Sequence, residues 1–416
     1  MQLSIALVII ITAAKAGGYI SYRLGQPSVL GELLAGIILG PTVINLLQHS
    51  YFGSEHITEM VHFLAEIGVL LLMFIAGMEL HLTDLIRSGK VAASAGISGV
   101  ILPVVMGTGL GLLFKTGSQE AIFIGLILAA TSVSISAQTL MELKVLRSKV
   151  GISLLGAAVF DDILVVLGLS IFIAIVSPQT DSGWLSILKL VLAMVIFLAI
   201  ATVFGKFLLP SLSRIVKNLP ISQGLIAFTF VTILLYGWAA EEFGNMAAIT
   251  GAFLAGLFFA RSPQKERIES GILPLAYGLF VPIFFINVGL NANLRDLTEE
   301  NFWLFLAITI VAIISKVLGA GLGGLIGGLN RHEAVQLGIG MMSRGEVGLI
   351  VASVGISQGI IPQNIFSIIV GVVIITTLFT PPLLRLSFHW FKDKEPEVKG
   401  DNPDLESKTS IEGAKP

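Results

Sequence analysis

Long apolar runs separated by short polar connections dominate the chain. A window of about 20 apolar residues crosses a bilayer as a helix, and about thirteen such windows occur along the chain. This pattern predicts an all-α integral membrane protein with about 13 transmembrane helices. The expected spans are roughly 2–23, 28–47, 58–79, 91–114, 120–140, 150–176, 184–209, 221–240, 245–260, 271–289, 301–328, 332–354 and 363–389.

The composition supports this interpretation. Hydrophobic residues make up 55% of the chain and charged residues 12%, with a mean hydropathy of +0.91, whereas about a quarter of the residues in soluble domains are charged. The net charge of −2 argues against a nucleic-acid partner. The absence of cysteine excludes disulfides, thiolate metal sites and cysteine nucleophiles. The apolar start of the chain follows no basic segment, so we expect a retained first helix rather than a cleaved signal.

The basic residues between the spans predict the orientation in the membrane. Cytoplasmic loops of membrane proteins carry an excess of Lys and Arg. In this chain, alternate loops differ strongly in their number of Lys and Arg residues. We therefore expect the N-terminus outside, the C-terminus in the cytoplasm of a prokaryote, and a disordered cytoplasmic tail over 391–416, which is charged and contains proline. The richer set holds Arg23, Arg87, Lys90, Lys144, Arg147, Lys149, Arg214, Lys217, Arg261, Lys265, Arg267 and Arg331, and the poorer set Lys115 and Arg295.

A short motif recurs in the two halves of the chain. GELLAG at 31–36, in the second span, is repeated as GAFLAG at 251–256, in the ninth. The copies are an odd number of helices apart and therefore run in opposite directions through the membrane. We expect two inverted six-helix repeats, helices 1–6 and helices 8–13, with a site at their interface.

Five charged residues fall deep within the spans: Asp161, Asp162, Lys316, Arg344 and Glu346. A charge at the centre of a spanning helix costs about 2.5–3.5 kcal/mol on insertion, so each is a candidate for function. Neighbouring residues on a helix point about 100° apart, so the adjacent aspartates cannot easily serve the same partner. One carboxylate can pair with Lys316 while the other faces a cavity. The alternative is that both only brace the helix bundle, which would leave one negative charge unused.

Small and polar residues gather in the middle of the fifth and twelfth spans, and we expect both helices to unwind and cross there. Unwinding exposes half-helix ends whose dipoles need compensation, a role that Arg344 and Glu346 can fill. For the fifth span the alternative is an unbroken helix whose hydroxyls bond to carbonyls one turn back. The fifth span contains Thr131, Ser132, Ser134 and Ser136, and the twelfth contains Ser343, Arg344, Gly345, Glu346 and Gly348.

These features together resemble the monovalent cation:proton antiporter-2 family. The resemblance rests on the spans, the Asp-Asp pair, ISKVLGAGLGG around Lys316 and SRGEVGLIVASVG from Ser343, and covers about 1–390. It implies that Asp162 binds the cation, with Thr131 as a further Na⁺ ligand. It also implies that Asp161 pairs with Lys316, and that Thr131 and Ser132 line the crossing point.

The resemblance further implies a homodimer with two functional parts. Helices 1–2 (residues 1–54) and helices 8–9 (211–262) would form the static interface. Helices 3–6 (55–180) and helices 10–13 (263–390) would form a transport core that moves against it like an elevator. Helix 7 (181–210) would link the two.

The expected function is antiport of a monovalent cation, Na⁺ or Li⁺, for protons, with pH homeostasis as its role. Proton and cation would compete for Asp162. The first alternative is a K⁺/H⁺ antiporter or K⁺ efflux protein of the same family, although such proteins usually carry Gln-Asp and a nucleotide-binding domain. Others are a Na⁺-coupled organic anion symporter or a cation channel.

We expect no resident cofactor and no enzymatic activity. Gly319, Gly321 and Gly324 formally match a dinucleotide-binding motif, but they lie inside a spanning helix with no preceding strand. Helix packing by small residues explains them better. No catalytic triad or phosphate-binding loop is recognisable in the sequence.

Overall fold

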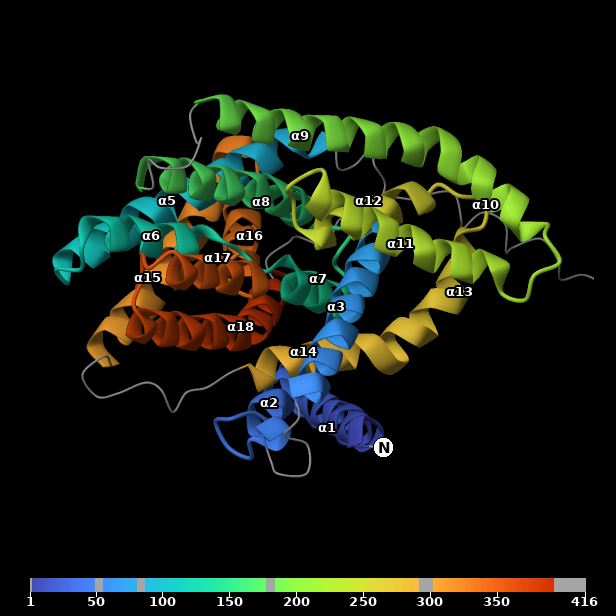
Figure 1. The fold of residues 1–416 in the computed structure, drawn as a ribbon, viewed down its shortest axis with the longest axis horizontal. Helices are drawn as coiled ribbons and strands as arrows, with labels where there is room; N and C mark the ends of the chain where they lie inside the picture. The colour runs from blue at the N-terminus through green and yellow to red at the C-terminus, as the bar shows by residue number, and fades with distance from the viewer. Residues whose placement is uncertain (1, 49–54, 81–86, 177–183, 292–301, 393–416) are drawn as a thin grey trace, which may run out of the picture.

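The computed structural model describes residues 2–48, 55–80, 87–176, 184–291 and 302–392. Within these ranges the regular secondary structure consists of helices, without β-strands (Figure 1). The tail expected to be disordered lies outside this part from residue 393. The α-helices are α1 (Gln2–Arg23), α2 (Ser28–Leu39), α3 (Glu55–Met78), α5 (Gly89–Leu113), α6 (Ser118–Ala129), α7 (Val133–Glu142), α8 (Lys149–Val176), α9 (Trp184–Val203), α10 (Leu209–Lys217), α11 (Gly224–Glu242), α12 (Ala248–Phe259), α13 (Lys265–Leu275), α14 (Val281–Leu290), α15 (Phe302–Gly327), α16 (Arg331–Gly340), α17 (Glu346–Ser357) and α18 (Gln363–Lys392).

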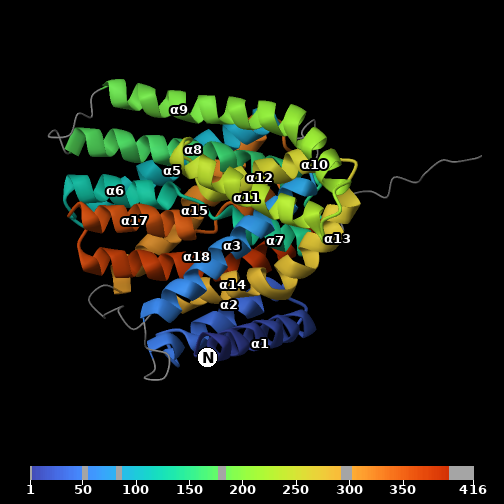
Figure 2. The ribbon, with the colours of Figure 1, turned by 45° about the vertical axis from the view of Figure 1, so that its right-hand side comes forward.

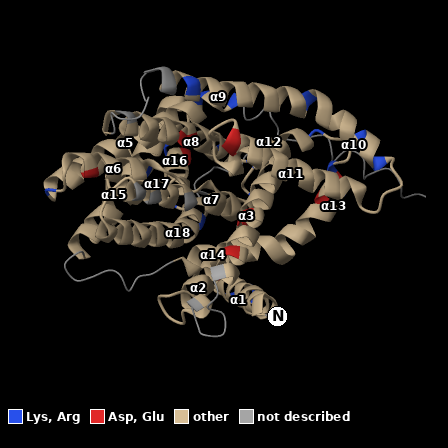
Figure 3. Cartoon of the chain, viewed as in Figure 1, with Lys and Arg blue, Asp and Glu red and all other residues tan. Residues whose placement is uncertain are grey.

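In the described part of the chain, ten helical segments are long and apolar enough to cross a membrane, and Figure 3 shows how few charged residues the helices carry. The chain is thus an all-helical, multi-pass membrane protein, as predicted. The other expected spans fall on shorter helices: α2, α12, and the pair α16 and α17. The expected second span is too long, because α2 ends at Leu39 before Gly40 and Pro41, and proline cannot continue a helix. The total of thirteen stays a prediction.

The fifth and twelfth spans are broken in mid-membrane, as the sequence predicts. Residues 130–132 separate α6 from α7, and residues 341–345 separate α16 from α17, both without helical backbone. The alternative of an unbroken fifth helix is therefore wrong. Two other spans continue through a π-helical turn instead, at Phe204–Leu208 and Ala276–Phe280. A π turn relieves the clash that a proline ring makes with the preceding turn, and Pro210 and Pro282 follow these two turns.

The helices pack in two groups. The first, here called the bundle, consists of α5–α8 and α15–α18, with α5 packed along α15, α6 and α8. The second, here called the panel, consists of α1–α3 and α11–α14, with α12 packed along α3 and α11, and α14 along α2. α9 contacts α8 of the bundle and α11 of the panel. In Figures 1 and 2 it lies on the opposite side of the molecule from α1 and α2.

The expected division into a static interface and a moving core stays a prediction, and the packing groups three of its helices differently. The sequence analysis assigns α3 and α13–α14 to the transport core together with the bundle. In the structure α3 packs most extensively along α12 and α14 along α2, and α13 contacts α11 and α3, so by packing all three belong to the panel. The physical reason is the close approach that the repeated glycine motif permits.

The two copies of that motif make equivalent contacts. A Cβ atom on the first glycine of either copy would overlap a carbonyl oxygen of the preceding helix, that of Gly17 for Gly31 and that of Tyr236 for Gly251. A Cβ on the second glycine would overlap a carbonyl of the other half of the chain. Gly36 meets Ile286 on α14, and Gly256 meets Phe74 on α3. Small residues of this kind allow helix backbones to touch in a membrane. The inverted repeat itself stays a prediction, which these matched contacts support.

We expect the Gly256→Ala variant to be destabilised, because the added methyl group must push α12 away from α3. Overpacking of this kind costs about 1–3 kcal/mol. Thermal unfolding of the detergent-purified protein, followed by tryptophan fluorescence, should show a lower midpoint. The matched control is Gly109→Ala on α5, where an added Cβ meets no atom within 4 Å. Equal midpoints for the two variants would contradict the close contact between α12 and α3.

Candidate functional site

The two aspartates lie on one unbroken helix and face different neighbours. α8 carries both, with Asp161 0% exposed and Asp162 7% exposed. Asp161 faces α15 through Lys316, and Asp162 faces α12 through Thr250. The angle between adjacent positions on a helix thus separates the two carboxylates, as the sequence predicts.

Lys316 on α15 is fully buried and uses all three of its ammonium hydrogens. Its Nζ donates to Asp161 Oδ1 at 2.5 Å, to the carbonyl of Ala129 at 2.7 Å and to the carbonyl of Gly99 at 2.8 Å. Ala129 is the last residue of α6, where the break leaves carbonyl oxygens without helical partners. The ammonium therefore pairs with a carboxylate and also compensates the negative end of a half-helix.

The two breaks cross and bond to each other directly. The backbone N–H of Ser132 donates to the carbonyl of Ser343 at 2.9 Å, and the Ser343 hydroxyl donates to the carbonyl of Ser132 at 2.6 Å. The Ser136 hydroxyl donates to the carbonyl of Gly340, the last residue of α16. These bonds satisfy backbone groups that the missing helical turns would leave unpaired in an environment without water.

Arg344 lies at the second break and is 1% exposed. Its guanidinium donates to the carbonyl of Met342 at 3.1 Å, just beyond the end of α16, and to that of Ala312 on α15 at 2.9 Å. A buried cation thus lies near the carboxyl end of each broken half-helix, Lys316 at α6 and Arg344 at α16. Glu346 is the first residue of α17, and its side chain lies outside the described part of the structure.

Hydroxyl and carboxylate oxygens without ordinary partners lie beside the Lys316–Asp161 pair. The Thr131 side chain interacts with Asp161. Within the described residues, however, neither Thr131 Oγ1 nor Asp161 Oδ2 has a hydrogen-bond partner at normal distance. Hydroxyl and carboxylate oxygens are hard ligands of the kind that suits a proton or a hard cation, so this pair of side chains is a candidate part of the ion-binding site.

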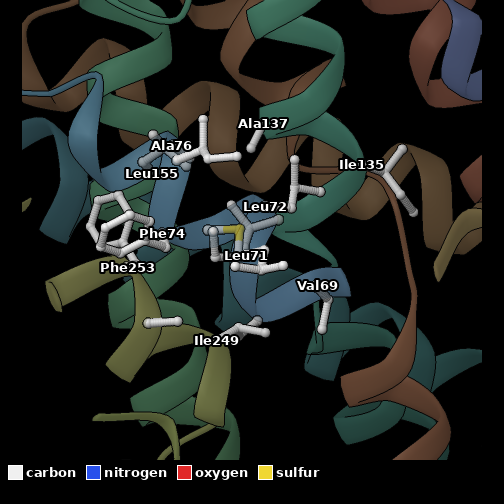
Figure 4. Close-up of a cluster of buried hydrophobic side chains, with 14 of the residues drawn as sticks. Val69, Leu71, Leu72, Phe74, Ala76, Ile135, Ala137, Leu155, Ile249 and Phe253 are labelled. Atoms are coloured by element: carbon white, nitrogen blue, oxygen red, sulfur yellow. The ribbon is translucent and has the colours of Figure 1, made fainter. Parts of the chain in front are cut away.

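Asp162 borders a cavity of about 10 Å³, roughly the space for one water-sized particle. Val133, which directly follows the first break, also lines it, so the cavity lies beside the crossing point. The other side is formed by the apolar cluster of Figure 4, in which α3 meets Leu155 of α8 and Ile249 and Phe253 of α12. The described residues contain no group of three or more His, Cys, Asp or Glu side chains that would hold a resident metal ion.

The structure adds one polar partner that sequence reasoning missed. The Thr250 hydroxyl donates to Asp162 Oδ2 at 3.2 Å from the first turn of α12. Thr250 directly precedes the second copy of the glycine motif, at a position where the first copy has Leu30. That difference between the copies was the available signal.

Comparison with known proteins identifies the family and the fold of the chain. Residues 6–386 match the model of a family described as sodium/hydrogen exchanger, transmembrane. A Na⁺/H⁺-K⁺ antiporter, GerN of Bacillus cereus, is 37% identical over 92% of this chain and 95% of its own length. A Na⁺/H⁺ antiporter of Enterococcus hirae is 34% identical over 91% and 96%. The solved sodium proton antiporter MjNhaP1 of Methanocaldococcus jannaschii shares the fold, with a TM-score of 0.65, 19% identity and coverage of 95% of this chain and 98% of that one.

We expect Lys316→Met to destabilise the protein strongly. The variant leaves the Asp161 carboxylate buried without its cation, and breaking a buried pair in this way costs about 3–5 kcal/mol. Thermal unfolding in detergent should show a large fall in the midpoint. The exposed Lys217 provides the control, because Lys217→Met removes an equal charge without a buried partner.

A double variant, Lys316→Met with Asp161→Asn, should recover part of the lost stability, since the uncompensated negative charge is gone. No recovery in the double variant would show that the pair is not the source of the loss.

Proposed function

This chain belongs to the sodium/hydrogen exchanger family, and we propose that it exchanges sodium ions for protons at Asp162. The observation that carries this proposal is the place of Asp162, a buried carboxylate beside an ion-sized cavity and next to a crossing of two broken helices. Its neighbour Asp161 is already paired with Lys316. The names of the relatives, antiporters of Na⁺ and H⁺, support the same function.

Antiport follows if Asp162 holds either a proton or a cation but never both. Carboxylate oxygens are hard ligands suited to a hard cation, and the same oxygens bind the proton. A rise in proton concentration on one side of the membrane then displaces the cation from the carboxylate. Competition at one site is sufficient to couple the two ions. We assign Thr131, whose side chain interacts with the Asp161 carboxylate, as a further Na⁺ ligand, and Ser132 as a residue that positions it.

Lys316 and Asp161 form the second functional pair. If Lys316 gives up its proton when Asp161 turns toward the cation, two protons move for each Na⁺ and the cycle carries charge. If Lys316 remains protonated, the exchange is one for one. The family resemblance favours the first version. In either case Arg344, together with Glu346, compensates the ends of the second broken helix.

We propose that the bundle moves against the panel to open the site alternately to either side. In this version α3 and α13–α14 stay with the static part, because α3 packs on α12, α14 on α2, and α13 on α11 and α3. The panel helices α1, α2, α11 and α12 would form the interface of a homodimer. The protein would lie in a prokaryotic plasma membrane, with its N-terminus outside, its C-terminus in the cytoplasm and a role in pH homeostasis.

Potassium is a second candidate cation. The name of one relative, GerN of Bacillus cereus, includes both Na⁺ and K⁺. The same Asp162 site would serve either ion.

We expect Asp162→Asn to abolish exchange without unfolding the protein, because the amide has a similar shape but cannot bind a proton and a cation in competition. The assay uses proteoliposomes with an acidic interior and an internal pH dye, with Na⁺, K⁺ or choline added outside. Wild-type protein should release protons in response to Na⁺. The variant should respond no more than protein-free liposomes do.

Na⁺-driven proton movement in the folded Asp162→Asn variant would overturn the proposal. A wild-type response to K⁺ as large as that to Na⁺ would assign the chain to K⁺/H⁺ exchange as well. A response to choline would indicate a leak.

We expect Lys316→Gln to change the charge moved per cycle. If two protons exchange for one Na⁺, a K⁺ ionophore that dissipates the membrane potential should accelerate wild-type exchange. The same ionophore should not affect the variant, whose Gln side chain carries no proton. Equal acceleration of both proteins would exclude Lys316 as the second proton carrier.

A further inference from the structure

Thr250 contacts the exchange carboxylate from the other group of helices. Asp162 lies on α8 of the bundle, and Thr250 lies on α12 of the panel. The hydroxyl-to-carboxylate distance is 3.2 Å, and the two residues are 4% and 7% exposed. The bond therefore crosses the boundary along which the proposed motion takes place.

The cavity beside this bond is lined mainly by apolar side chains. Among the described residues that line the cavity beside Asp162, only Asp162 and Thr250 have polar side chains. The rest are hydrophobic, among them Met73, Leu155 and Phe253. In a buried, low-dielectric site, a hydrogen bond to a carboxylate is electrostatically stronger than in water. The position of Thr250 in the first turn of α12, at the positive end of the helix dipole, adds to the attraction.

The strength of this bond depends on what Asp162 holds. An ionised carboxylate only accepts hydrogen bonds, and a bond to a charged group is roughly twice as strong as a neutral one. A proton or a cation on Asp162 neutralises the carboxylate and weakens the bond. The contact between bundle and panel is therefore strongest when Asp162 is empty and charged.

We propose that the Thr250 hydroxyl is a coupling residue, which holds the empty, ionised Asp162 against α12 so that the unloaded bundle does not cross the membrane. This inference rests on the proposed function, in which Asp162 carries either ion. Exchange is obligatory only if the carrier does not cross the membrane with Asp162 empty, because otherwise one ion flows down its gradient without the other. The hydrogen bond from Thr250 to Asp162 can hold the empty carrier on one side of the membrane.

A Na⁺ ligand at this position would act differently. A ligand that travels with the ion should lie on the same moving part as Asp162, as Thr131 does. Thr250 lies on the panel, so a cation bound by both residues would have to lose one ligand before each crossing. The two roles predict opposite effects on the apparent affinity for Na⁺, which separates them by experiment.

The test measures net Na⁺ efflux from proteoliposomes into a medium without Na⁺, at alkaline pH, with the membrane potential clamped. Few protons are then available to load the carrier for its return. Wild-type protein should release radioactive sodium slowly under these conditions. Thr250→Val keeps the shape of the side chain but lacks the hydroxyl, and it should release sodium about tenfold faster. A factor of ten corresponds to a loss of roughly 1.4 kcal/mol in the stabilisation of the empty carrier. Thr250→Ser keeps the hydroxyl and should behave as wild type.

Two controls make the result specific. Adding Asp162→Asn to Thr250→Val should remove the efflux, which shows that the sodium passes through the same site. Glu142→Gln weakens a different contact between bundle and panel, in which Glu142 of α7 accepts bonds from the backbone and the hydroxyl of Ser28 on α2. That contact does not depend on the ion held by Asp162, so the variant should not raise net efflux.

Three results would overturn the inference. The first is that Thr250→Val exchanges ions normally and releases sodium no faster than the wild-type protein does. The second is a raised KM for Na⁺ with intact coupling, which would make Thr250 a cation ligand. The third is that Glu142→Gln raises net sodium efflux as much as Thr250→Val does. Failure of the proposed function is distinguishable from all three, since it requires exchange to persist in Asp162→Asn alone.

Discussion

The charge of Lys316, buried without access to water, is the constraint on which the centre of the structure depends. An ammonium at this depth is tolerated only if each of its hydrogens finds an acceptor and its charge finds a partner. The acceptors come from three other helices, as the carbonyl of Gly99 on α5, the carbonyl of Ala129 on α6 and the carboxylate of Asp161 on α8. One side chain of α15 thereby holds together the bundle that carries the site.

The same constraint explains why the fifth span can break in a membrane. A break in a spanning helix leaves carbonyl and amide groups that lipid cannot satisfy. At the first break Lys316 donates to the carboxyl end of α6, and at the second Arg344 donates near the end of α16. Ser132 and Ser343 satisfy further backbone groups across the crossing. The cost of irregular backbone is thus offset by groups that also place polar atoms at mid-membrane.

Two adjacent aspartates have different roles because a helix turns them toward different neighbours. Asp161 is committed to Lys316, so its charge is compensated inside the bundle. Asp162 faces the panel and an ion-sized cavity, where its charge meets the Thr250 hydroxyl. A carboxylate with a hydrogen-bond partner across a boundary between helix groups can change the contact at that boundary when it binds an ion, whereas one that is paired within the bundle stabilises the fold.

The features that depend on local chemistry could be predicted from the amino-acid sequence. Apolar length predicted the membrane and nearly all of the helices, and the clusters at Thr131–Ser136 and Ser343–Gly348 predicted where two of them break. The cost of burying charge singled out Asp161, Asp162, Lys316 and Arg344 from the residue pattern alone. That one aspartate pairs with Lys316 was inferred from helix geometry, although which of the two does so came only from the family resemblance.

Which helices pack against each other could be learned only from the three-dimensional arrangement. In a membrane chain, lipid-facing and protein-facing positions are both apolar, so hydrophobic periodicity does not reveal the packing partners of a helix. For this reason the grouping of α3 and α14 with the panel was missed, although the glycines that allow it were recognised as a repeat. The carbonyls that accept hydrogen bonds from Lys316, and the Thr250 hydroxyl on Asp162, were missed for the same reason, since each belongs to a helix distant in sequence and carries no local signal of its partner.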